Sequence, residues 1–117
     1  MSEFLFNPYL YKAKVIDVHD GDTVTLNIDL GFGVILQNQK LRFAGINAPE
    51  LTGANATAGA ASRDWLKAKL LGQDVIIESI KDRQEKYGRW LAKVFLPNNS
   101  EMSLNDELVK LGFAVKY

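Results

Sequence analysis

The sequence has 117 residues, is 47% hydrophobic, and carries 14 basic and 14 acidic side chains, so its formal net charge is zero. This length and composition predict one globular domain, residues 1–117, with a hydrophobic core. The balanced charge argues against a protein that holds nucleic acid by overall charge alone. Because cysteine is absent and His19 is the only histidine, the sequence also argues against disulfide frameworks, zinc sites and the Ser-His-Asp and Cys-His classes of catalysis.

The early apolar stretch at residues 4–11 does not resemble a targeting or membrane segment. It is short, is interrupted by Asn7 and Pro8, and follows an acidic start. These features are not typical of a signal peptide, and no later run approaches membrane-spanning length. We therefore expect a soluble protein without a membrane partner, with a monomer as the default oligomeric state. Its location is expected to be cytoplasmic or is left unknown, with secretion only if a leader was removed. His19 is expected to be a surface residue.

The first half of the chain has the alternating pattern of β-strands. Residues 12–18 and 34–46 favour extended structure, and residues 23–30 alternate with Val24, Leu26, Ile28 and Leu30 on one face. Asp20 and Gly21 predict a hairpin turn between the first two strands. Residues 1–11 are expected to form an N-terminal extension ahead of these three strands.

The second half adds two helices and two strands. Residues 58–71 are alanine-rich and stop at Gly72, and residues 104–111 follow Ser103, a residue type that caps helix N-termini. Residues 75–80 and 90–96 read as strands. The sequence thus predicts a mainly β, α+β domain, in which five strands form a small Greek-key β-barrel and two helices pack on it.

Oxygen-bearing side chains occur at two points where the chain turns. Asp22 opens the second strand, and Asn47, Ala48, Pro49 and Glu50 form a short segment stiffened by its proline. Carboxylate, amide and backbone carbonyl oxygens are the ligands that calcium prefers. The two groups could form a partial cation site, although each alone also fits an ordinary turn or a solvated loop.

Two arginines lie within or beside apolar strands. Arg42 stands between Leu41 and Phe43, and Arg89 follows Tyr87 and Gly88 where a strand opens. A guanidinium can bind two phosphate oxygens at once and keeps its charge as negative charge develops in a transition state. The pair therefore suits a phosphodiester site, although an arginine on a strand is more often a solvated residue.

The ordered set of these motifs resembles the staphylococcal nuclease-like (thermonuclease) family. The resemblance covers nearly the whole chain from Lys12 onward. It rests on three motifs and on a continued similarity through Leu108, Val109, Gly112 and Ala114. The motifs are Asp20-Gly21-Asp22-Thr23-Val24, Arg42 with Pro49-Glu50 downstream, and Lys86-Tyr87-Gly88-Arg89.

The resemblance implies a five-stranded OB-fold barrel and a calcium-dependent nuclease. The partner it implies is DNA or RNA, and we expect single-stranded or locally melted chains to be favoured. Cleavage would leave a 3′-phosphate and a 5′-hydroxyl. The implied roles are catalysis by Arg42, Glu50 and Arg89, metal binding by Asp22, Asn47, Ala48 and Glu50, and substrate binding by Lys86, Tyr87 and Tyr117.

One position departs from the family pattern within the implied metal site. Asn47 stands where the family has its second calcium-binding aspartate. An amide oxygen can still coordinate calcium, but the site has one negative charge fewer and should bind the ion more weakly. The alternative is a non-catalytic module that binds nucleic acid or protein and has a weakened metal site.

Overall fold

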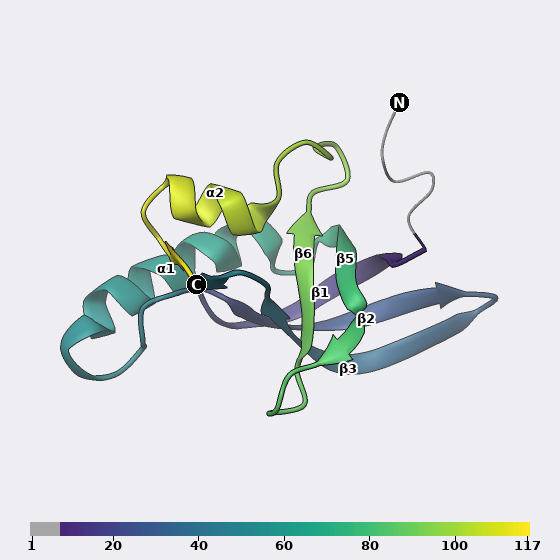
Figure 1. Cartoon of the computed structure of the whole chain (residues 1–117), viewed down its shortest axis with the longest axis horizontal. Coiled ribbons are helices and arrows are strands. Elements are labelled where there is room, and N and C mark those ends of the chain that lie inside the picture. The colour runs from purple at the N-terminus through teal and green to yellow at the C-terminus, as the bar shows by residue number, and fades with distance from the viewer. Residues whose placement is uncertain (1–7) are drawn as a thin grey trace.

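The computed structural model describes residues 8–117, without the side chains of residues 81–83, and its main element is a closed β-barrel. Neighbouring strands follow the order β1-β2-β3-β6-β5, and only β3 and β6 pair in parallel. The predicted five-stranded barrel with two helices is confirmed (Figure 1). The strands are β1 (Leu10–Asp20), β2 (Thr23–Gly31), β3 (Val34–Phe43), β5 (Asp74–Gln84) and β6 (Trp90–Phe95).

Alternating side chains fill the barrel interior. Val24, Leu26, Leu41 and Phe43 are fully buried, as their positions in the strands predict. Leu30 was expected on the same buried face as Val24, but it is 39% exposed. The reason is visible in Figure 1, where the hairpin of β2 and β3 extends beyond the barrel, so its outer residues have less of the core to pack against.

Two helices cover the end of the barrel opposite this hairpin (Figure 1). A 3-10 turn, η2 (Gly53–Asn55), leads into α1 (Ala56–Leu70), which packs on β1 and buries Leu66 and Leu70 completely. The second helix, α2 (Leu104–Lys110), is capped at its N-terminus by Ser103, whose side chain accepts a hydrogen bond from the Asp106 amide at 3.1 Å. The predicted N-cap is confirmed.

A buried asparagine ties α2 to the barrel. The Asn105 side chain accepts from the Val94 amide at 2.9 Å and donates to the carbonyls of Ala44 and Ala92 at 2.8 and 3.2 Å. These groups lie where β3 and β6 meet, a junction of three paired residues. Asn105 therefore holds the narrowest seam of the barrel together from outside.

The third predicted strand, residues 34–46, is broken in the structure. β3 ends at Phe43, and the chain turns through Ala44 and Gly45. Gly45 has a φ of +76°, a left-handed conformation that glycine adopts easily. It then forms β4 (Ile46–Asn47), which pairs with β7 (Val115–Lys116) in a separate two-stranded sheet. This second sheet was not predicted, because strands of two residues carry no periodicity.

The predicted N-terminal extension, residues 1–11, ends earlier than expected. β1 begins at Leu10, so its last two residues belong to the barrel, and residues 1–7 lie outside the described part of the chain. Between residues 8 and 117, no helix is long and apolar enough to cross a membrane.

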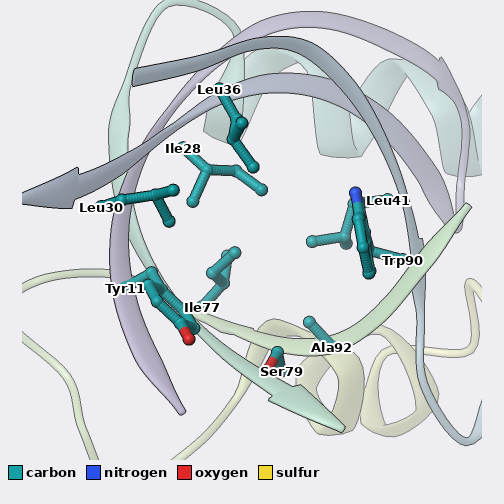
Figure 2. A pocket seen from close by; sticks show the side chains of 9 residues that line it. All are labelled: Tyr11, Ile28, Leu30, Leu36, Leu41, Ile77, Ser79, Trp90 and Ala92. Carbon is teal, nitrogen blue, oxygen red and sulfur yellow. The ribbon is translucent and has the colours of Figure 1, made fainter. Parts of the chain in front are cut away.

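An apolar cavity of about 260 Å³ opens inside the barrel, at the end away from the β1–β2 turn (Figure 2). It lies between the first residues of β1 and the last residues of β2. Figure 2 shows that its side chains point inward from all five barrel strands. They are Tyr11, Ile28, Leu30, Leu36, Leu41, Ile77, Ser79, Trp90 and Ala92.

Candidate functional site

The two-residue turn between β1 and β2 places Asp22 at the other end of the barrel. The Asp22 amide donates to the Asp20 carboxylate at 3.0 Å, which stabilises the turn. Gly21 is required here by close packing and not by its φ, which is not positive. A Cβ on Gly21 would lie 2.0 Å from Ser62 Oγ on α1 and 2.8 Å from Ala48 Cβ. The turn is thus pressed between α1 and the segment that follows β4.

The Asp22 carboxylate is buried and receives hydrogen bonds on both oxygens. Its side chain is only 10% exposed, Oδ1 accepts from Thr23 Oγ1 at 3.1 Å, and Oδ2 accepts from the Ala48 amide at 2.8 Å. Burial raises the pKa of Asp22, the nearby Asp20 side chain adds to the rise, and the Ala48 amide opposes it. A cation bound beside Asp22 would oppose this rise.

The Arg42 guanidinium lies against two of the predicted metal ligands. Its Nη2 atom donates to Asn47 Oδ1 and lies 3.7 Å from Asp22 Oδ2, while Nη1 donates to the Phe43 carbonyl at 3.1 Å. The ring of Tyr117 covers the guanidinium, 5.4 Å from centroid to carbon. The pairing of β4 with β7 brings Tyr117 there, and its amide donates to the Gly45 carbonyl.

Arg89 is held in place by Glu85, a residue that sequence reasoning missed. Arg89 Nε and Nη2 donate to the two carboxylate oxygens of Glu85 at 3.1 and 3.0 Å, and the amides of Tyr87 and Arg89 donate to the same carboxylate. Hydrogen bonding to Arg89 lowers the pKa of Glu85 to about 2, and Glu85 in turn raises the pKa of Arg89. The pair is therefore fully charged near neutral pH.

Arg89 also has donors that its contacts with Glu85 do not use. A guanidinium has five N–H groups, of which Glu85 takes two and Thr23 Oγ1, 3.3 Å from Nη1, takes one. One N–H on each Nη atom is left, and together these form a fork that can bind two oxygens of a phosphate. Thr23 also donates to Asp22, so a chain of contacts connects Arg89 to Asp22 and from there to Arg42.

The other predicted residues lie at the edge of this network. Glu50 is exposed, and the described part of the chain gives its carboxylate no hydrogen bond or ion pair. Its backbone, however, is tightly packed, since a Cβ on Gly59 of α1 would lie 2.1 Å from the Glu50 carbonyl oxygen. Tyr87 is 71% exposed, and Lys86 lies over its ring at 5.0 Å.

The donor chemistry fits a hard cation. Among the side chains that the structure describes, which leave out residues 1–7 and 81–83, no group of three or more His, Cys, Asp or Glu is placed to hold a metal. The oxygens of Asp22 and Asn47 nevertheless both lie against the positive guanidinium of Arg42. Two such oxygens that already attract one cation are suitable ligands for calcium, with backbone carbonyls and water completing the shell.

Glu85 was missed by sequence reasoning, and Thr23 and Asp20 were named in a motif without a role in the site; all three carry only weak signals. Glu85 stands four residues before Arg89 across a glycine turn, a spacing that gives no contact in a regular strand. Thr23 and Asp20 flank Asp22 and are the residue types that commonly stabilise turns. Their roles become visible only when the turn is folded.

The chain is similar in sequence to known nucleases. The model of the staphylococcal nuclease homologue family matches residues 40–117. The thermonuclease of Staphylococcus hyicus is 36% identical over 104 residues, which cover 86% of this chain and 56% of that protein. The thermonuclease of Staphylococcus intermedius is 34% identical over 109 residues, with coverages of 91% and 57%.

A third relative comes from a distant organism. An endonuclease of Saprolegnia parasitica is 28% identical over 128 residues, which cover 98% of this chain and 60% of that protein. The chain thus spans between 56% and 60% of the length of these three relatives. Because the family match extends over more than half of the chain and includes Arg42, Glu50 and Arg89, the chain belongs to the staphylococcal nuclease homologue family.

Proposed function

We propose that this domain hydrolyses phosphodiester bonds of DNA or RNA with the help of calcium. The observation that carries the proposal is the placement of Arg42 and Arg89 around Asp22. Arg42 lies 3.7 Å from the Asp22 carboxylate, and Arg89 reaches it through Thr23 at 3.3 Å. Membership of the nuclease family and the nuclease names of three relatives support the same reaction class.

The two arginines would bind and stabilise the reacting phosphate. The free fork of Arg89 can hold two non-bridging oxygens, and Arg42 supplies a second guanidinium on the other side of Asp22. Both groups keep their charge as negative charge develops on the phosphorane, so they lower the barrier more than they tighten ground-state binding. Their fixed positions avoid reorganisation at the moment of reaction.

Glu50 is the proposed general base. Its exposed carboxylate is free to accept a proton from water, and its backbone is held against Gly59. The water oxygen forms a new bond to phosphorus, the proton passes to Glu50, and the bond to the 5′-oxygen breaks. Solvent protonates that oxygen, which yields a 3′-phosphate and a 5′-hydroxyl.

Asp22 and Asn47 would hold the calcium ion, with the Ala48 carbonyl and a water held by Glu50 completing the predicted set. The ion would supply positive charge and Lewis acidity at the phosphate. In the structure, the positive guanidinium of Arg42 lies against the oxygens of Asp22 and Asn47 that would bind the ion. Since Asn47 carries no charge of its own, we expect a calcium requirement higher than that of a site with two carboxylates.

Incubation of the purified chain with single- and double-stranded DNA, in calcium or in chelator, tests the proposal. We expect calcium-dependent cleavage with 3′-phosphate ends. Glu50→Gln, Arg42→Ala and Arg89→Ala should each lower turnover by about 100-fold or more, whereas the exposed control Lys93→Gln should not. If all three variants cleave at the wild-type rate, the site is misplaced.

Asn47→Asp tests the calcium site separately. The added carboxylate should lower the calcium concentration needed for half-maximal activity, and an unchanged requirement would contradict ligation by residue 47. The uncharged Asn47 also supports a second candidate, a binding module without useful catalysis. That module would bind single strands in chelator, show no thermal stabilisation by calcium, and leave DNA uncut.

A further inference from the structure

A groove on the outer wall of the barrel runs on from the candidate site. It has a volume of about 570 Å³, within the range of small-ligand sites. It shares Thr23 and Arg89 with the network described above, so a molecule bound at the site can continue into it. The other side chains that line it are Asp17, His19, Thr25, Lys40 and Tyr87.

Strand register places the groove next to Arg42, two residues further along the strands. Thr23 pairs with Arg42, and Thr25 pairs with Lys40 and with Asp17. Lys40 and Arg42 are two residues apart on β3, so they share its outer face at a separation of roughly 6.7 Å along the strand. A nucleic-acid strand whose phosphate lies at Arg42 would therefore meet Lys40 next.

The groove offers one contact for a phosphate and one for a base. Lys40 is exposed and carries a positive charge, the usual partner of a backbone phosphate. The ring of Tyr87 is 71% exposed, with the Lys86 ammonium at 5.0 Å and the Arg89 guanidinium at 5.6 Å from its centroid. An exposed ring beside an arginine is a suitable surface for base stacking. Asp17, on the far wall, repels phosphate and so favours the Lys40 side.

We propose that this groove binds the nucleotide next to the scissile one in a single-stranded substrate. Lys40, which the family resemblance does not name, would hold its phosphate, and the base would lie beside Tyr87, which the resemblance already implies to bind substrate. The inference rests on the proposed function, because it is the site that fixes where the neighbouring phosphate lies. A single strand fits better than a duplex, since only unpaired bases can turn onto a side-chain ring.

The groove proposal is tested by measuring the affinity of the protein for a single-stranded dinucleotide and for a single-stranded hexanucleotide. Chelator is present in both measurements, so that the strands are not cleaved. Lys40→Gln should weaken hexanucleotide binding severalfold, more than dinucleotide binding, and lower the slope of log affinity against log salt by about 0.7. Lys40→Arg should restore the slope. Lys93→Gln, an exposed lysine on β6 that does not line the groove, is the matched control and should change neither quantity.

The two proposals fail in different ways. If Lys40→Gln and Lys93→Gln have equal effects, or if both oligonucleotides lose the same affinity, the groove is not a subsite, even when the protein cleaves DNA. If the expected difference is found and the calcium assay shows no cleavage, the groove remains valid and the nuclease proposal is overturned. Wild-type protein that fails to bind the hexanucleotide at low salt overturns the groove proposal.

Discussion

The two ends of the barrel are built from the same strands but differ in chemistry. At one end, Asp22 is buried among hydrogen-bond donors and two arginines, and α1 packs against its turn. At the other end, the strands enclose an apolar cavity of about 260 Å³, and the β2–β3 hairpin extends from it without a covering helix (Figures 1 and 2).

The difference shows how one small domain separates stability from function. Burying Asp22 disfavours its charged form, since burial raises its pKa, and the apolar interior of the barrel must offset that cost. Changes at the polar end should therefore alter activity strongly and can even increase stability. Changes at the apolar end should alter stability alone.

Glu85→Gln should give the largest effect on activity among the following variants that keep the proposed metal ligands. The variant replaces the oxygen that accepts from Arg89 Nη2 with an amide that cannot accept, so the guanidinium loses its fixed orientation. We expect kcat/KM to fall by up to about 100-fold, mainly through kcat. Steady-state kinetics on a DNA substrate measures the loss, and the exposed Glu101→Gln is the control. Equal kinetics for both variants would mean that Glu85 does not position Arg89.

Gly59→Ala should disturb the Glu50 segment through helix α1. The new methyl group would lie 2.1 Å from the Glu50 carbonyl oxygen, a backbone atom that cannot move alone. We expect a loss of about 1–3 kcal/mol in the free energy of unfolding, together with lower activity. Urea unfolding and kinetics measure the two effects. The neighbouring exposed Ala58→Gly, which adds no atom to the interface, should leave activity unchanged.

Asp22→Asn should stabilise the calcium-free protein near neutral pH while removing activity. The native pKa of Asp22 is raised, so above that pKa the folded state carries an ionised group that it disfavours. The extra free energy of unfolding of the variant should decrease as pH falls through the raised pKa of Asp22 in the folded state. It should vanish below 3.8, the pKa of Asp22 in the unfolded chain. Urea midpoints at several pH values in chelator measure it. A variant less stable than wild type at pH 7 would contradict the assignment.

Phe32→Asn at the apolar end should give the smallest effect. Phe32 and Gly33 have φ values of +57° and +78° and form the two-residue turn between β2 and β3, a geometry that favours Asn-Gly. Phe32 is fully exposed, so its replacement removes no packing. We expect a gain of about 1 kcal/mol with unchanged activity. Thermal unfolding together with a cleavage assay would detect either a loss of stability or a change in rate.

The barrel could be predicted from the sequence because its strands alternate regularly. Val24, Leu26, Leu41 and Phe43 follow the period of two and are fully buried, and Ser103 marks the start of α2 as expected. The polar end was predicted in its main residues, since Asp22, Arg42 and Arg89 stand in recognisable motifs. Their metal-binding and catalytic roles stay predictions.

What escaped prediction depends on contacts between distant segments. Gly21 looked like a turn glycine, but it is needed because Ser62 and Ala48 approach it closely. The β4–β7 pair that brings Tyr117 to Arg42 joins residues about seventy positions apart through strands of two residues. Such contacts follow from the closed fold, and no local pattern encodes them.

The hydrogen bonds from Asn105 on α2 to the barrel imply an order of folding during protein synthesis. β1, β2 and β3 are neighbours in the sequence and can pair as soon as they leave the ribosome. The short parallel junction of β3 and β6 has one side-chain hydrogen bond of its own, from Trp90 to Gln39, and gains the contacts of Asn105 with the Ala44 and Ala92 carbonyls only when α2 arrives. We therefore expect a ribosome-bound chain that lacks α2 to hold a folded hairpin but no assembled site.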